Sequence, residues 1–128
     1  MTDPLVSGKK ILVIDDDPVM IKLTESRLTV HGYHVAVSRE APAGLEMALK
    51  DKPDLIILDV MMPIVNGYNF CRLLKSQKAH KHIPIIFLTS RATEKDKEIG
   101  KEVGADAYLT KPVDMDQLLE MIGNLLRS

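Results

Sequence analysis

Short runs of apolar residues recur along the chain and alternate with longer amphipathic segments. Three runs are wholly apolar, at residues 11–14, 55–58 and 85–88. An apolar run without polar alternation is typical of a strand that is covered on both faces of a parallel sheet. Two mixed runs, at residues 33–37 and 107–110, have the length and the flanking residues of further strands. The pattern therefore predicts five strands.

Helical periodicity fills the intervals between these strands. Asp17 is expected to cap the first helix, with Pro18 at its first position and Gly32 at its end. Asp114 is expected to cap the last helix. Helices are predicted over residues 18–31, 42–50, 68–76 and 94–103, and over a last segment that begins after Asp114.

Two of these helices differ in the apolar face that they offer. The helix at 68–76 is expected to bury Phe70, Cys71, Leu73 and Leu74. The helix at 94–103 is highly charged, and its apolar face is thin, mainly Ile99 and Val103. Its charged face reads most simply as a solvated surface.

Five strands that alternate with five helices predict an α/β fold with a parallel five-stranded sheet. Right-handed crossovers restrict the winding, and the flavodoxin-like strand order 2-1-3-4-5 is common at this length. In that doubly wound arrangement, five helices flank the sheet on both faces. We assign residues 1–7 to an N-terminal tail and residues 8–128 to a single domain.

Polar residues end the apolar strands abruptly. Asp15 and Asp16 follow the first strand, and Asp59 follows the third. Thr89 follows the fourth strand, and Lys111 follows the fifth. Because the carboxyl ends of parallel strands share one rim, and the first and third strands are neighbours at the switch point, we expect these five side chains to form one site.

The residue types in this set favour phosphoryl chemistry. Carboxylates from adjacent strands form a hard oxygen site suited to Mg²⁺. Asp59 stands alone at its strand end, where a carboxylate beside a metal can act as a nucleophile. Lys111 and Thr89 offer the charge and the hydroxyl donor that phosphoryl oxygens need. No residue is obviously placed as a general base, so the pattern favours a phosphoryl acceptor over an enzyme that turns over.

Composition excludes several other classes. The chain has 17 basic and 18 acidic residues, a net charge of −1, which argues against direct nucleic-acid binding and against a polybasic membrane anchor. Cys71 is the one cysteine, so no disulfide forms within the chain, and we expect it to be inert packing. The N-terminus lacks the apolar stretch of a signal peptide. We therefore expect a cytoplasmic, soluble protein with no organic cofactor.

Four motifs give the sequence a specific resemblance. ILVIDDDP, LIILDVMMPIVNG, IIFLTS and AYLTKP occur in this order over about residues 8–127. In this order and spacing they resemble the receiver domain of response regulators from bacterial two-component systems, the CheY-like superfamily. The resemblance implies that residues 8–128 form a receiver domain for phosphorelay signalling.

The resemblance assigns a role to each site residue. Asp59 matches the phosphoacceptor, and Thr89 and Lys111 match the residues that contact the phosphoryl group. Asp15 and Asp16 match the acidic pair that holds Mg²⁺ together with Asp59, with the backbone carbonyl of Met61 as a further ligand. Tyr108 matches an aromatic switch whose rotamer couples to Thr89, and the Lys111–Pro112 bond is expected to be cis. Met61 and Arg91 match positions that flank the phosphoryl group, and we expect them to slow its hydrolysis.

The resemblance also implies partners. A sensor histidine kinase or a histidine phosphotransferase would supply the phosphoryl group. A downstream protein target or an output domain would read the signal on the surface formed by residues 94–103, residues 107–110 and the last helix, which could also form a dimer. Either a stand-alone receiver or the receiver of a longer regulator fits the sequence.

Other readings stay open at this point. A haloacid-dehalogenase-like phosphohydrolase would use Asp15 as its nucleophile, in a pattern that runs from Asp15 to Val19, and would bind Mg²⁺ with Asp114 or Asp116. A non-phosphorylated interaction module on the same fold is a third class. Asp17 reads more simply as a helix cap, and His80 and His82 as solvated loop residues rather than metal ligands.

Overall fold

The computed structural model describes residues 8–60, 66–90 and 93–127, and all ten predicted elements lie within these ranges. The strands are β1 (Lys10–Ile14), β2 (His34–Ser38), β3 (Leu55–Asp59), β4 (Ile85–Thr89) and β5 (Ala107–Thr110). The helices are α1 (Pro18–Val30), α2 (Ala41–Asp51), α3 (Gly67–Lys75), α4 (Glu94–Glu102) and α5 (Met115–Arg127). The predicted tail at residues 1–7 lies outside the described residues.

The five strands form one parallel sheet in the order β2-β1-β3-β4-β5, as predicted. Strands β1 and β3 pair in the middle of the sheet, with Ile14 opposite Leu58. The residues that follow these two partners, Asp15 and Asp59, therefore emerge side by side. The sheet thus brings together two carboxylates that are 44 positions apart in the sequence.

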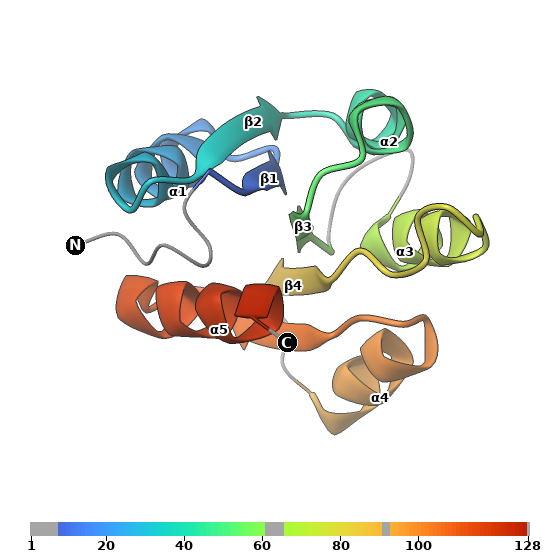
Figure 1. Ribbon diagram of the computed structural model, residues 1–128. Helices are drawn as coiled ribbons and strands as arrows, with labels where there is room; N and C mark the ends of the chain where they lie inside the picture. Colours follow the sequence, from blue (N-terminus) through green and yellow to red (C-terminus); the bar gives the residue numbers. More distant parts are fainter. Residues whose placement is uncertain (1–7, 61–65, 91–92, 128) are drawn as a thin grey trace.

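Two hydrophobic cores lie on the two faces of the sheet (Figure 1). Helices α1 and α5 cover one face, where Val13, Ile57 and Leu88 pack against Leu28 and Leu118. Helices α2, α3 and α4 cover the other face, whose core includes side chains from β3 and β4 together with Phe70 and Leu74. Burial on both faces explains why four successive residues in each of β1, β3 and β4 are apolar, at 11–14, 55–58 and 85–88.

A side-chain cap fixes the start of α1, the helix that follows Asp15 and Asp16. The side chain of Asp17 accepts a hydrogen bond from the backbone N–H of Val19 at 3.0 Å, and Pro18 is the first residue of α1, as predicted. At the start of the last helix, the Asp114 carboxylate accepts from the backbone N–H groups of Asp116 and Gln117, which confirms its predicted role as the cap of α5.

Two burial predictions were wrong. Leu73 is 50% exposed, because the buried stripe of α3 runs through Gly67, Phe70, Cys71 and Leu74, and Leu73 lies beside that stripe. His80 is buried rather than solvated, and its Nε2 forms a 2.9 Å hydrogen bond with the carbonyl of Leu49 at the end of α2. His82 is exposed, as expected.

Candidate functional site: an acidic pocket at the carboxyl ends of the strands

The loop after β1 holds two carboxylates in different environments. Asp15 is only 1% exposed, and its Oδ1 accepts the backbone N–H of Asp17 at 3.0 Å. Asp16 is exposed. The buried carboxylate is therefore fixed by its own turn, whereas its neighbour faces solvent.

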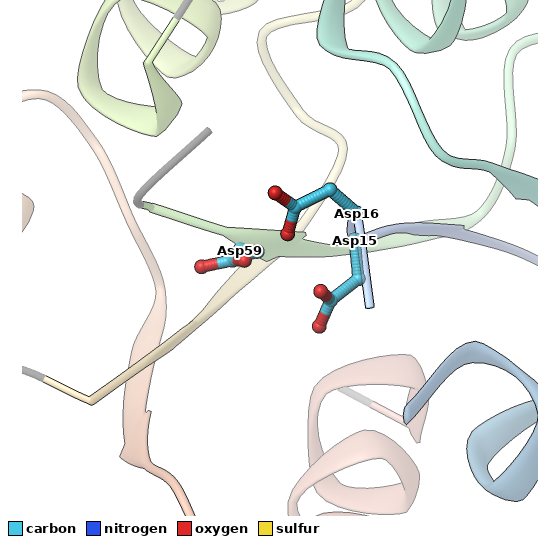
Figure 2. Close-up of side chains that lie close together, drawn as sticks. All are labelled: Asp15, Asp16 and Asp59. Atoms are coloured by element: carbon cyan, nitrogen blue, oxygen red, sulfur yellow. The ribbon is translucent and has the colours of Figure 1, made fainter. Parts of the chain in front are cut away.

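Asp59 completes the cluster from the adjacent strand. It is the last residue of β3 and is 5% exposed. One carboxylate oxygen from each of Asp15, Asp16 and Asp59 lies within 4.8 Å of the others, and Figure 2 shows the three side chains at the ends of β1 and β3. Charges this close repel one another by several kcal/mol at an effective dielectric constant of about 20, so the cluster is suited to bind a cation.

Lys111 provides a positive charge to this cluster. Its Nζ lies 2.9 Å from Oδ2 of Asp15 and 3.5 Å from Oδ2 of Asp59. Burial lowers the pKa of Lys111, but the hydrogen bonds and charges of Asp15 and Asp59 outweigh that effect and leave the pKa raised. Lys111 therefore stays charged and bridges the carboxylates at the ends of β1 and β3. A single ammonium group does not neutralise the three carboxylates of the cluster. The Lys111–Pro112 peptide bond is cis, as expected.

Thr89 and Tyr108 extend the site across the sheet. Thr89 ends β4 and is fully buried, and its backbone carbonyl accepts the N–H of Lys111 at 2.7 Å. Tyr108 lies on β5, opposite Phe87 of β4. Burial raises the pKa of the Tyr108 hydroxyl, and a hydrogen bond with Tyr68 raises it further, whereas a hydrogen bond with Thr89 acts in the opposite direction. The Tyr108 ring packs edge-on against Phe87, with ring centroids 6.1 Å apart.

The structure thus brings together Asp15, Asp16, Asp59, Thr89 and Lys111, and sets Tyr108 beside them, as the sequence predicts. Met61 and Arg91 lie outside the described residues. No role was predicted from the sequence for Tyr68 or Asp96, and the Tyr68 hydroxyl donates to the backbone carbonyl of Asp96 at 3.4 Å. A signal for Asp96 was present, because Thr93 and Asp96 have the spacing of a helix-capping pair and bond to each other at the start of α4.

The carboxylates that the hydrolase alternative needs have other partners. Asp17 caps α1, and Asp114 caps α5. Asp116 forms an ion pair with Arg27 at 3.2 Å. The geometry therefore favours the grouping in which Asp59, rather than Asp114 or Asp116, joins Asp15 and Asp16.

Within the described residues, no helix is both long and apolar enough to cross a membrane.

Comparison with protein families gives a match over almost the whole chain. The family model for the response regulator receiver domain matches residues 11–123. The response regulator PleD from Caulobacter vibrioides is 40% identical over 118 residues, which cover 92% of this chain and 26% of PleD. The chain spans about half the length of several other curated relatives that it matches.

Solved structures agree with these matches. The chemotaxis protein CheY4 from Vibrio cholerae has a TM-score of 0.87 at 31% identity, over 93% of this chain and 99% of that chain. The receiver domain of the sensor histidine kinase PA1611 from Pseudomonas aeruginosa has a TM-score of 0.87 at 29% identity, over 95% of this chain and 100% of that chain, and holds a magnesium ion in its active-site cleft. The hydrolase alternative finds no support in these comparisons.

Proposed function

Because this chain belongs to the response regulator receiver domain family, we propose that it is a phosphorylation-dependent signalling domain that accepts a phosphoryl group on Asp59. The observation that carries the assignment is the position of Asp59. Its carboxylate sits at the end of a central strand, beside Asp15 and Asp16 and within 3.5 Å of the Lys111 ammonium.

The transfer that we propose is a single displacement at phosphorus. A carboxylate oxygen of Asp59 attacks the phosphorus of a phosphohistidine, the new O–P bond forms, and the P–N bond breaks. The imidazole leaves with the electron pair of the P–N bond and takes up a proton. Lys111 and the Thr89 hydroxyl stabilise the charge on the phosphoryl oxygens. At most, we expect self-phosphorylation from small phosphodonors and slow loss of the phosphoryl group, not turnover of a substrate.

We further propose that Mg²⁺ is the metal of the site. The donor set fits it, because the carboxylates of Asp15, Asp16 and Asp59 are hard oxygen ligands from a few residues, which leaves room for the waters that Mg²⁺ retains. When bound, the ion neutralises charge on the carboxylates and on the phosphoryl group. The backbone carbonyl of Met61 is proposed as a further ligand on the resemblance alone.

The face of α1 next to the site fits a phosphodonor protein. Helix α1 buries Ile21, Thr24 and Leu28, yet Val19 and Leu23 on another side are 65% and 54% exposed. Val19 and Leu23 lie in the first two turns of α1, the helix that follows the acidic loop at residues 15–17. Exposed apolar side chains at this place suit docking of a histidine kinase or a histidine phosphotransferase. Leu23→Ser should slow transfer from such a protein and leave transfer from acetyl phosphate unchanged. If the phosphodonor protein transfers to Leu23→Ser as fast as to the wild type, this docking site is wrong.

For output, we propose the surface formed by α4, β5 and α5, which a downstream protein, an output domain or a second copy of the chain would contact. Thr89 ends β4, which lies between β3 with Asp59 and β5 with Tyr108, so a phosphoryl group that recruits the Thr89 hydroxyl would change the surroundings of Tyr108. Met61 and Arg91 remain our candidates for tuning the lifetime of the phosphoryl group.

The test of the phosphoacceptor is covalent labelling. Incubation with acetyl phosphate and Mg²⁺ should add one phosphoryl group, visible by intact-mass measurement and removed by hydroxylamine as an acyl phosphate is. Asp59→Asn should abolish the adduct. Asp17→Asn is the matched control, since asparagine also caps a helix, and it should be labelled like the wild type. An adduct that persists in Asp59→Asn would overturn the assignment.

A further inference from the structure

One margin of the sheet is only partly covered, along β2. This strand is the outermost one, and among the described residues it pairs with β1 alone (Figure 1). His34 and Ala36 of β2 lie opposite Lys10 and Leu12 of β1, so these four side chains point to the sheet face that α2 covers. Leu12 is buried there, whereas Ala36 is exposed. Helix α2 therefore covers β1 but leaves the neighbouring part of β2 open.

The packing of α2 explains why this part of the sheet stays open. The first half of the helix lies tightly on β1, because a side-chain carbon at position 44 would come within 2.7 Å of the Ile14 side chain. This close approach holds the helix over β1. Ala36 on the outer strand has only a methyl group, which does not reach across to the second half of the helix. The two elements are therefore separated by unfilled space at this end.

That space is a hollow of about 640 Å³ between the second half of α2 and the amino ends of β1 and β2. Its apolar lining includes Leu12, Ala36, Met47 and Pro53. Sites that hold a small organic ligand typically have volumes of about 300–1,000 Å³ and a mostly apolar lining. The hollow has both properties, and it lies at the end of the strands opposite to the acidic cluster.

The charged groups of the lining favour an anion. Lys10 of β1 and Lys50 of α2 both line the hollow, and Asp51 is the one carboxylate in the described lining. Within residues 8–60, 66–90 and 93–127, the side chains of the two lysines form no hydrogen bond or ion pair, since Lys10 bonds to Asp54 only through its backbone N–H. His34 adds an imidazole to the same rim. Two ammonium groups without partners are thus available to an acidic ligand.

We propose that this hollow is a binding site for a small aromatic anion, that is, a ring system that carries one carboxylate, sulfonate or phosphate group. The rings would lie among Leu12, Ala36 and Met47, because a thioether makes favourable contacts with aromatic rings. The acidic group would pair with Lys10 and Lys50. This site goes beyond the proposed function, since it contains none of the residues of the acidic cluster, and its test needs no phosphorylation.

The test uses 8-anilino-1-naphthalenesulfonate as the anionic probe, followed by the amide NMR shifts of the full chain. The shifts should saturate with a single Kd and should be confined to residues 10–12, 34–36 and 47–52. N-phenyl-1-naphthylamine, which has the same rings without the sulfonate, should bind about fivefold more weakly, because it gains no ion pair. Equal affinity of the two probes would contradict the anion site. Shifts centred elsewhere, for example on residues 19–26, would overturn the proposal.

Two variants test the lining itself. Ala36→Leu fills the hollow from an exposed strand position and should weaken binding of the anionic probe by about tenfold or more. Ala43→Leu is its matched control, at an exposed position of α2 outside the lining, and should bind like the wild type. Lys50→Gln should weaken binding by about threefold through loss of one charge. Lys95→Gln makes the same charge change at an exposed position of α4 and should have no effect.

Urea unfolding of each variant checks that the fold is kept, and Lys50→Gln still tests the site if Ala36→Leu does not fold. Binding to a folded Ala36→Leu with the wild-type Kd would overturn the proposal, as would an equal loss in Lys50→Gln and Lys95→Gln. A second copy of the chain is the other possible occupant of this margin. If the amide shifts of residues 34–36 change with protein concentration when no probe is present, that copy covers the hollow and the proposal is wrong.

Discussion

Thr24 lies on the buried stripe of α1, fully enclosed, and among the described residues its hydroxyl has no hydrogen-bond partner. Burying a hydroxyl without a partner costs on the order of 1–3 kcal/mol, whereas a methyl group of the same size costs nothing comparable. Thr24→Val should therefore raise the free energy of unfolding by about 1 kcal/mol, measured by urea denaturation. Thr29→Val, at an exposed position of the same helix, should change it by less than about 0.5 kcal/mol. A destabilised Thr24→Val would show that the hydroxyl is satisfied in solution.

Cys71 gives the molecule a pH dependence with a definite sign. Its thiol is buried and donates to the carbonyl of Val103 at 3.1 Å, and burial raises its pKa to about 11 from an ordinary value of 9.0. Between these two values the unfolded chain loses the proton while the folded chain keeps it, so stability should fall as the pH rises. Urea denaturation at about pH 8 and about pH 10.5 should show a steeper fall for the wild type than for Cys71→Ala. Lys111 contributes a fall of the same sign to both proteins, so equal slopes would contradict the role of the thiol.

The site residues whose positions could be predicted from the sequence are those that lie at the carboxyl ends of strands. Asp15, Asp59 and Lys111 follow apolar runs, and the strand order alone brings such positions together. Tyr68 could not be placed in this way, because its contact with α4 depends on how two helices approach each other. His80 was misjudged for a similar reason, since a polar loop sequence does not reveal that the loop packs onto the end of α2.

At the scale of elements, Gly67 controls how closely α3 follows the strand that carries Asp59. A side-chain carbon at position 67 would lie 2.7 Å from the Cα of Val60, and the N–H of Gly67 donates to the carbonyl of Val60 at 2.9 Å. Because backbone cannot move aside as a side chain can, Gly67→Ala should destabilise the fold by about 2–3 kcal/mol in thermal or urea unfolding.

Gly123→Ala is the control for that prediction. The three atoms nearest the added carbon all belong to the guanidinium of Arg127, which is the end of a flexible side chain. Inside α5 the exchange should be neutral or stabilise by up to about 1 kcal/mol, through helix propensity. Similar losses in the two variants would show that the approach of α3 to Val60 is not the cause.

The elements themselves were predictable because each carries a strong local signal. Burial on both faces gives each of β1, β3 and β4 a run of four apolar residues, and Asp17 with Pro18 fixes the start of α1. The side of α3 that faces the core could not be predicted from its sequence alone. It contains apolar residues at 73 and 74 in succession, and only tertiary packing decides that Leu74 points inward and Leu73 outward.

At the scale of the whole molecule, the fold concentrates negative charge at one end of the sheet and balances it incompletely. The two cores hold β1 and β3 in register, and this register keeps Asp15 and Asp59 together although they repel. Lys111 reduces the repulsion from the far side of the sheet. The repulsion among the carboxylates therefore lowers the stability of the fold, and a bound divalent cation would reduce this repulsion.

This leads to a prediction for metal addition and removal. A ligand that binds only the folded state stabilises it by about 1.4 kcal/mol at ten times its Kd, and for a chain of this size that corresponds to a rise in Tm of roughly 3–8 °C. Mg²⁺ should therefore raise the Tm of the wild type, and EDTA should reverse the rise.

Asp16→Asn should abolish most of this response. Because Asp16 is exposed, the variant should unfold near the wild-type Tm when no metal is present, which separates a lost ligand from a damaged fold. Asp17→Asn should respond like the wild type, and NaCl at matched ionic strength should not reproduce the rise, since screening acts on all exposed charges alike. A wild-type Tm that ignores millimolar Mg²⁺, or an equal rise in Asp16→Asn, would contradict the metal site.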